Sequence, residues 1–289
     1  MGKNIELSLG FSTCPNDTFI FEAMVSGRID TEGLAFRPFL ADVEELNRKA
    51  FNAEIDITKL SYHAYAHVSK DYMVLDSGSA LGQKNGPLLL SRKKIYPDEV
   101  PDLRIAIPGR YTTANLLLDI AHPSVKEKRE YLFSDIEEAV LSGEMDAGLA
   151  IHENRFTYQK RGLHKIMDLG DYWEALSGMP IPLGGIMIRR NLPREVILKV
   201  NRIVKRSVEY AWDAPAVVMP YVRKYAQEMD REVMTRHIRL YVNEYTSDLG
   251  ETGKTAIRRL FGEAFKRQVI PEYHPHLFIS DQGSVTREP

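Results

Sequence analysis

Three short segments, residues 12–18, 59–61 and 109–114, carry hydroxyl, amide and charged side chains where a predicted strand gives way to a helix. In open α/β sheets, ligands bind beyond the carboxyl ends of the strands, so we expect these segments to meet. Helix N-termini attract anions through free N–H groups and the helix dipole. The pattern therefore predicts a site that binds the carboxylate or phosphate group of a ligand. The side chains expected to line it are Asn16, Asp17, Ser61, Thr112 and Thr113.

The hydroxyl groups of Ser61 and Thr112 have a second interpretation. Serine and threonine are favoured N-cap residues, and each of these two residues precedes a predicted helix. Taken singly, either residue is better explained as a cap. The coincidence of several such turns at one sheet edge favours a ligand site.

His152 directly follows the predicted strand 147–151 and so lies at the same sheet edge. A neutral imidazole at this place can accept a proton near pH 7, which suits a general base. Position alone leaves an ordinary hydrogen-bonded histidine at a strand end equally open.

Three further motifs could bind a metal or phosphate or act as a nucleophile, but each is better explained by a structural role. His63 and His67 have the spacing of helical metal ligands, but the glutamate of the common zinc motif is replaced by Ala64. Residues 250–255 resemble a phosphate-binding loop but lack its first glycine and a preceding strand, which favours a turn between helices. Cys14 has no histidine partner close in sequence, so we interpret it as a small buried residue. We predict no metal site.

The elements that must position these residues alternate between strand and helix in the first hundred residues. Strands are expected at 5–11, 34–40, 54–60, 73–75 and 88–91, and helices after Asn16 or Asp17, after Asp42 and after Ser61. Such alternation predicts a largely parallel sheet covered by helices.

The same pattern restarts after a charged segment with two prolines at 93–101. Strands are expected at 103–107, 147–151 and 182–189, with helices at 112–120 and from a Ser134–Glu137 capping box to Gly143. After Pro193 the chain reads as helical to Phe265, and an irregular tail follows Pro271. We predict an α/β protein of two lobes with a ligand cleft between them. The larger lobe comprises 1–96 and 189–289, and the smaller one 97–188.

Composition limits the function classes. The chain has 289 residues, 44% of them apolar, and a formal net charge of −2, so no overall basic field attracts nucleic acid or an anionic membrane. A single cysteine permits no intrachain disulfide. The first residues alternate like a strand and not like a signal sequence, and no run approaches the ~18 apolar residues of a membrane span. We expect a cytoplasmic protein with no nucleic-acid or membrane partner, and the sequence leaves its oligomeric state unknown.

Several motifs together carry a family resemblance. The most specific is Ser-Thr-Cys-Pro-Asn-Asp-Thr-Phe at 12–19, and the others are at 42–47, 59–61, 79–82, 86–88, 111–115, 151–153 and 182–185. In this order they resemble the 1,4-dihydroxy-6-naphthoate synthases of the futalosine route to menaquinone. The resemblance runs from about residue 5 to residue 265.

This resemblance implies a fold like that of type II periplasmic binding proteins. It implies cyclic dehypoxanthine futalosine, a carboxylated polyol, as the small anionic substrate, with 1,4-dihydroxy-6-naphthoate and dihydroxyacetone as products and no redox cofactor. The family's proposed general base matches His152. Its substrate contacts match Lys59, Leu60, Ser61, Thr113 and Ala114.

Three other functions compete with this one. A solute-binding protein uses the same fold without chemistry, but it would normally carry a secretory signal or a lipid-anchoring cysteine. The sister enzyme of the pathway, a chorismate dehydratase, has a similar fold, but the motifs at 14–19 and 151–153 favour the synthase. A ligand-sensing regulator would need a DNA-binding helix pair or a basic face.

Overall fold

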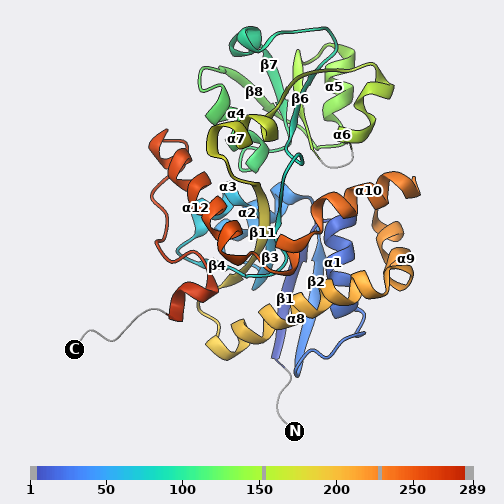
Figure 1. Cartoon of the computed structure of the whole chain (residues 1–289), viewed down its shortest axis with the longest axis vertical. Helices are drawn as coiled ribbons and strands as arrows, with labels where there is room; N and C mark the ends of the chain where they lie inside the picture. The colour runs from blue at the N-terminus through green and yellow to red at the C-terminus, as the bar shows by residue number, and fades with distance from the viewer. Residues whose placement is uncertain (1–4, 152–153, 227–229, 284–289) are drawn as a thin grey trace, which may run out of the picture.

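The computed structural model describes residues 5–151, 154–226 and 230–283, which form two α/β lobes stacked along the long axis of the molecule (Figure 1). Each lobe contains one β-sheet with helices packed around it. Segments from near both ends of the chain lie in the larger lobe, and the middle of the chain forms the smaller one. The predicted fold class, a two-lobed α/β protein, is confirmed.

The sheet of the larger lobe has the strand order β2-β1-β3-β11-β4, and β5 also pairs with β11. Its strands are β1 (Ile5–Phe11), β2 (Leu34–Leu40), β3 (Ile57–Ser61), β4 (Tyr72–Val74), β5 (Ala80–Gly82) and β11 (Ile181–Arg189). β1 runs parallel to β2 and β3, whereas β11 is antiparallel to β3, β4 and β5. Because β1 and β3 are parallel, the turn after β1 and the end of β3 lie at one sheet edge.

The sheet of the smaller lobe has the order β10-β6-β9-β7-β8. Its strands are β6 (Leu88–Ser91), β7 (Arg104–Ile107), β8 (Glu127–Glu130), β9 (Ala147–Ala150) and β10 (His164–Asp168). β7 is parallel to β8 and β9, so the loop after β7 and the end of β9 also share an edge. The short strands β5, β8 and β10 have no clear periodicity and were not expected.

Strand pairing divides the chain differently from the expected lobe limits of 96/97 and 188/189. β6 lies before residue 96 yet pairs in the smaller lobe's sheet. Residues 181–188 of β11 lie within the limits expected for the smaller lobe, yet this strand pairs in the larger lobe's sheet. β6 is apolar and wholly buried, which a central strand requires. The second half of the charged segment at 93–101, expected as a connector, forms most of the 3₁₀ helix η1 (Pro97–Asp102), which precedes β7 in the chain.

Helices cover both sheets. Those of the larger lobe are α1 (Pro15–Val25), α2 (Val43–Phe51), α3 (Tyr62–Val68), α8 (Arg194–Asp213), α9 (Pro215–Tyr225), α10 (Arg231–Tyr241), α11 (Glu244–Ser247), α12 (Gly250–Lys266) and the 3₁₀ helix η3 (Ile279–Gly283). Those of the smaller lobe are α4 (Thr113–Ala121), α5 (Ile136–Ser142), α6 (Asn154–Thr157), the 3₁₀ helix η2 (Tyr158–Arg161) and α7 (Leu169–Ser177). The expected helical region after Pro193 is confirmed, and the 250–255 segment forms the first turns of α12.

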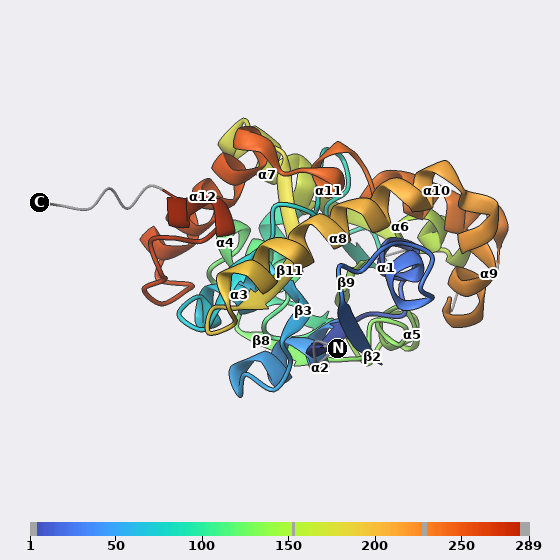
Figure 2. The same ribbon diagram turned by 90° about the horizontal axis from the view of Figure 1, so that it is seen from below.

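Two large hydrophobic clusters hold these layers together. One packs α1, α8, α9 and α10 against the larger sheet, and Figure 2 shows the long α8 crossing the molecule beside that sheet. The other runs from Leu60 and Tyr65 through Leu116 and Trp173 to Leu260, and so spans both lobes. The lobes therefore share a continuous apolar contact.

The helix starts differ in part from expectation. α1 begins at Pro15 with Cys14 as its N-cap, so Asn16 and Asp17 lie in the first turn and do not cap it. Proline suits the first helical position because its φ is fixed and its missing N–H is not needed there. The expected Ser134–Glu137 capping box is wrong, since Asp135 holds the N-cap position without a side-chain bond. The expected cap at Asp42 is confirmed, because its carboxylate accepts from the Glu44 N–H at 2.8 Å.

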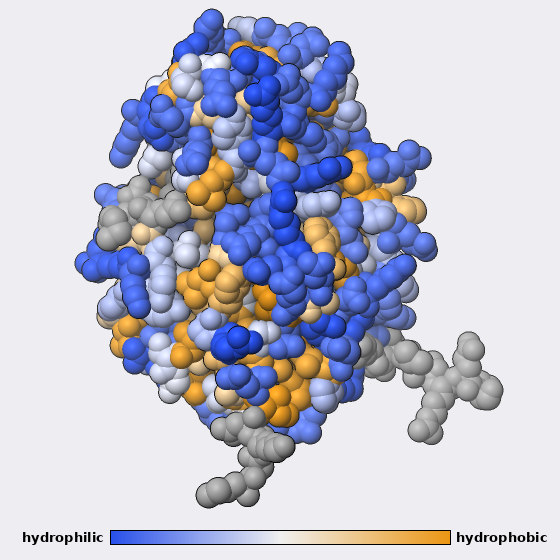
Figure 3. All heavy atoms as spheres, turned by 180° about the vertical axis from the view of Figure 1, so that it is seen from behind, coloured by the Kyte–Doolittle hydropathy of each residue, from blue (hydrophilic) through white to orange (hydrophobic). Residues whose placement is uncertain are grey.

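The segment after Pro271 has little regular structure, as expected, but it is packed against the larger lobe. Leu277 and Phe278 are buried, and Phe278 forms a β-bridge with Val74. On the face shown in Figure 3, hydrophilic side chains predominate and apolar ones form separate patches. Within the described ranges, no helix is both long and apolar enough to cross a bilayer.

Candidate functional site

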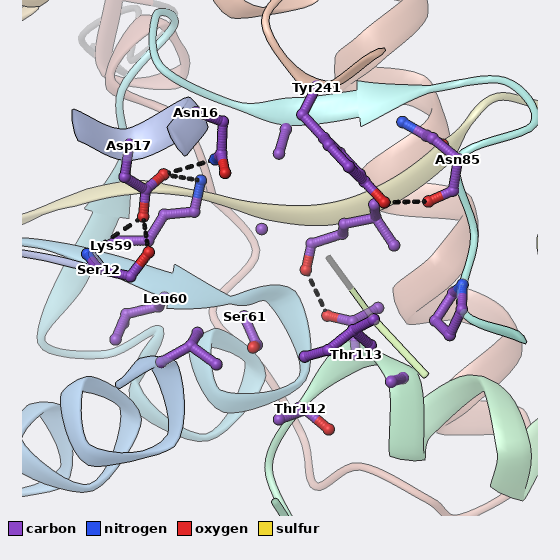
Figure 4. Close-up of a pocket in the computed structure, with 17 residues that line it drawn as sticks. Ser12, Asn16, Asp17, Lys59, Leu60, Ser61, Asn85, Thr112, Thr113 and Tyr241 are labelled. Atoms are coloured by element: carbon purple, nitrogen blue, oxygen red, sulfur yellow. Dashed lines mark hydrogen bonds and ion pairs between the residues drawn. The ribbon is translucent and has the colours of Figure 1, made fainter. Parts of the chain in front are cut away.

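A pocket between the lobes gathers the segments that the sequence singled out (Figure 4). All eight expected site residues among the described ones line it: Asn16, Asp17, Lys59, Leu60, Ser61, Thr112, Thr113 and Ala114. The other lining residues are Ser12, Val43, Ala80, Asn85, Pro87, Ile151, Leu183, Gly184 and Tyr241. The structure thus brings the three strand-end turns together, while their contact with a substrate stays a prediction.

The wall formed by the larger lobe contains a buried ion pair. Lys59 Nζ in the middle of β3 lies 3.1 Å from Asp17 Oδ1 on α1, and both side chains are almost fully buried. Ser12 holds the other carboxylate oxygen, with its hydroxyl donating at 2.7 Å and its N–H at 3.2 Å to Asp17 Oδ2. The Lys59–Asp17 contact is close enough for an ion pair but lacks hydrogen-bond geometry. Within the described residues, the ammonium protons therefore have no hydrogen-bond acceptor, and a ligand in the pocket could supply one.

Ser61 occupies the N-cap position of α3 without capping the helix. It precedes α3, but its side chain makes no capping bond. Its N–H donates to Asn47 Oδ1 at 3.0 Å, and its hydroxyl oxygen accepts weakly from Asn47 Nδ2 at 3.4 Å. The capping interpretation therefore fails for Ser61, whose hydroxyl group lies at the pocket.

The smaller lobe contributes a neutral wall from the start of α4. Thr112 is its N-cap, with Oγ1 accepting from the Asn115 N–H, so the capping interpretation is confirmed there. The Thr113 hydroxyl donates at 2.6 Å to the Leu183 carbonyl on β11. Behind this wall, burial lowers the pKa of His63 to about 3, so its ring is neutral beside the Thr112 carbonyl at 3.2 Å. Thr113 and Ala114 in the first turn of α4 line the pocket, and the N-terminus of a helix favours anions.

β11 contributes Leu183 and Gly184 to the pocket lining, and its backbone at Gly184 lies very close to the backbone of β3. A Cβ at Gly184 would lie 2.7 Å from the Leu60 carbonyl oxygen and 3.3 Å from Lys59 Cε. Glycine permits this approach because it has no Cβ to collide with the Leu60 carbonyl.

Glu44 on α2 joins the two lobes beside the pocket. Its carboxylate accepts from Asn47 Nδ2 at 3.0 Å and from the Tyr111 N–H at 3.3 Å in the loop after β7. Burial raises the pKa of Glu44 above its ordinary value, against the opposing effect of these hydrogen bonds. Gly109 in the same loop packs against this carboxylate so tightly that a Cβ would lie 2.6 Å from it.

The expected general base, His152, lies outside the described residues. Its neighbour Ile151, which follows β9, lines the pocket. Cys14 is buried at the start of α1, as expected. Among the described residues, no group of three or more His, Cys, Asp or Glu side chains is arranged to hold a metal ion.

Sequence reasoning missed three polar residues of the site, Ser12, Asn85 and Tyr241. Ser12 was inside an expected turn but was not singled out, and Asn85 follows the unexpected strand β5. Tyr241, from α10, reaches the pocket and donates at 3.3 Å to the Asn85 carbonyl. Only the hydrophobic spacing of α10 is visible in sequence, so nothing local marks Tyr241 as a pocket residue.

Known proteins with similar sequences cover nearly the whole chain. The family model described as menaquinone biosynthesis matches residues 7–266. A 1,4-dihydroxy-6-naphtoate synthase from Thermus thermophilus is 44% identical over 273 residues, which cover 94% of this chain and 99% of that protein. A protein of the same name from Streptomyces coelicolor is 42% identical over 277 residues, covering 93% and 96%.

Solved structures agree with the lobed architecture. A crystal structure of a protein from Archaeoglobus fulgidus has a TM-score of 0.88 at 38% identity, covering 93% of this chain and all of that one. The ligand-binding component of an ABC-type import system from Staphylococcus aureus has a TM-score of 0.70 at 12% identity, covering 98% of this chain and all of that one. Such low identity shows the fold alone, which is that of periplasmic binding proteins. Taken with the family match, these findings show that the chain belongs to the menaquinone biosynthesis family.

Proposed function

We propose that this chain is a 1,4-dihydroxy-6-naphthoate synthase, a carbon–carbon lyase that converts cyclic dehypoxanthine futalosine to 1,4-dihydroxy-6-naphthoate and dihydroxyacetone. The observation that carries this proposal is 44% and 42% identity to two proteins of that name over nearly their full lengths. The geometry supports it, because the pocket offers one buried cation and several hydroxyl groups to a carboxylated polyol. We place the enzyme in the cytoplasm.

Substrate binding would use both walls. The Lys59 ammonium and the N-terminus of α4 attract the carboxylate. The Ser61 and Thr113 hydroxyls, with the backbone at Leu60 and Ala114, orient the rest of the molecule. Closure of the lobes around it would exclude water and strengthen these contacts.

The chemical step would begin with proton removal by His152. A retro-aldol-like cleavage of a carbon–carbon bond follows, and formation of the aromatic ring drives the reaction forward. The conversion needs no redox cofactor. A non-catalytic binding protein and a chorismate dehydratase are not favoured, since the similar full-length relatives carry the synthase name.

Product formation from cyclic dehypoxanthine futalosine tests the proposal. We expect turnover by the wild type and a loss of at least ~10²-fold in kcat for His152→Ala. His122→Ala, a half-buried histidine at the end of α4, is the matched control and should keep near-wild-type activity. Absence of wild-type turnover, together with saturable binding of a small carboxylate, would move the protein to the binding class.

The pH dependence of kcat/KM gives a second test of the base. A histidine acting as a base should produce a limb near neutral pH in the wild type. A profile without such a limb would contradict the role of His152 even if turnover is observed.

A further inference from the structure

His237 on α10 is fully buried, and it reaches the pocket wall through one side chain. Its Nε2 lies 2.9 Å from Asn16 Oδ1 in the first turn of α1. Its ring packs at 4.6 Å from the ring of Tyr241, which itself lines the pocket. His237 does not line the pocket among the described residues, so any effect on a ligand must pass through its neighbours.

The direction of the hydrogen bonds is determined by Asp17. Asn16 Nδ2 donates at 2.8 Å to Asp17 Oδ1, and a carboxylate can only accept from it. This contact fixes the orientation of the Asn16 amide, so that Asn16 Oδ1 faces His237. An amide oxygen accepts, and Nε2 of His237 must therefore carry the proton.

A continuous series of contacts thus leads from α10 to the pocket cation. His237 donates to Asn16, Asn16 donates to Asp17, and Asp17 forms the ion pair with Lys59. Asn16 bonds to Asp17 Oδ1, the same oxygen that faces Lys59 Nζ, so the position of this amide bears directly on the ion pair (Figure 4). Each group is buried, and a buried polar group that loses its partner is destabilising, so the neighbouring side chains would rearrange on its removal.

We propose that His237 is a positioning residue for substrate binding: through Asn16 and Asp17 it holds the Lys59 ammonium where the anionic group of the substrate meets it. This inference rests on the proposed function, in which Lys59 contacts the substrate. It assigns to the C-terminal helical region an indirect part in substrate binding at a pocket built from strand-end turns.

Steady-state kinetics with a pair of substitutions test this role. His237→Leu removes the donor at similar volume, and we expect KM to rise about tenfold with a smaller change in kcat. His237→Gln can place an amide N–H near the position of Nε2, and it should restore KM to within about threefold of wild type. A histidine that merely fills space would give equal effects in both variants, which would overturn the proposal. His122→Leu is the control for loss of a histidine outside the series.

A double-mutant cycle tests whether the effect passes through Lys59. If it does, His237→Leu should change KM less than about twofold in a Lys59→Gln background. Additive effects would overturn the proposal. If His237→Leu does not fold, Asn16→Ala removes the intermediate amide instead. KM should then rise about tenfold, and it should change less than about twofold in the Lys59→Gln background.

A measurement without substrate separates this inference from the proposed function. Side-chain ¹⁵N NMR should show His237 with a proton on Nε2, and Asn16→Ala should shift that signal. An Nε2 without a proton would overturn the positioning series. Failure of the wild type to turn over the substrate would instead overturn the proposed function.

Discussion

The two walls of the pocket are built in different ways. The wall of the larger lobe contains a buried ion pair whose partners come from distant elements: Lys59 from β3, Asp17 from α1, and His237 from α10 behind them. The wall of the smaller lobe is neutral and largely local, with Thr112 bonding to residues three positions away on either side. Thr113 adds two long-range bonds, because its hydroxyl donates to the Leu183 carbonyl on β11 and accepts weakly from the His63 N–H on α3.

This difference assigns separate tasks to the walls. A buried cation beside its counter-ion gives strong discrimination for charge, because neither member is screened by water. Hydroxyl groups and the N-terminus of a helix give direction and a weaker attraction to anions. We therefore expect the larger lobe to contribute most of the affinity for a charged ligand and the smaller lobe to determine the orientation of that ligand.

The largest effect should follow removal of the cation. Lys59→Met eliminates the charge and leaves Asp17 buried without its counter-ion, so kcat/KM should fall about 10²–10³-fold. Lys49→Met, which removes a lysine paired with Glu54 near the surface, is the control and should stay near wild type. A loss below tenfold for Lys59→Met would contradict the division of tasks.

The next largest effect should come from disturbing the contact between the lobes at Gly109 and Glu44, and it should appear in the free energy of unfolding. At Gly109, φ is +147° and an added Cβ would lie 2.6 Å from Glu44, so Gly109→Ala should cost about 2–4 kcal/mol in the free energy of unfolding. Gly27→Ala is the matched control, with φ of +67° and no atom within 4 Å. Its cost should be about 1–2 kcal/mol, from backbone strain alone. Urea unfolding of both variants measures the difference, and equal costs would show that contact with Glu44 is unimportant.

A moderate effect is expected in the neutral wall. Thr113→Val preserves shape but removes the donor to the Leu183 carbonyl, and kcat/KM should fall about tenfold. The exposed Thr255 on α12 provides the control substitution, Thr255→Val. If Thr113→Val lowered kcat/KM as much as Lys59→Met, the neutral wall would contribute as much to substrate recognition as the charged wall.

The smallest effect concerns Glu44, the carboxylate between the lobes. Its pKa is raised in the folded protein because it is buried, so the folded state holds the proton more tightly than the unfolded state. Its stabilising contribution is fully present below the ordinary value of 4.5 and is lost as pH rises through the raised pKa. Glu44→Gln should therefore reduce the loss in the free energy of unfolding as pH rises above 4.5, as measured by urea unfolding at a series of pH values. Glu45→Gln, at an exposed position on the same helix, should leave it unchanged.

Local sequence determined much of this molecule. The alternation of strand and helix predicted the α/β class, and the polar residues at strand ends predicted five side chains that line one pocket. The family resemblance added Lys59, Leu60 and Ala114, which line the same pocket. These predictions succeed because hydrophobic periodicity and helix-start residues act over a few positions, and because parallel strands necessarily end at one sheet edge.

Tertiary structure alone decided the sheet to which β6 belongs and the partners behind the pocket. The strand 88–91 is apolar in either lobe, so its sequence does not choose between two sheets. The bond from His237 to Asn16 joins residues 221 positions apart, and Tyr241 reaches the pocket from the same helix. Such contacts depend on how α10 packs against α1, and no spacing within either helix specifies that arrangement.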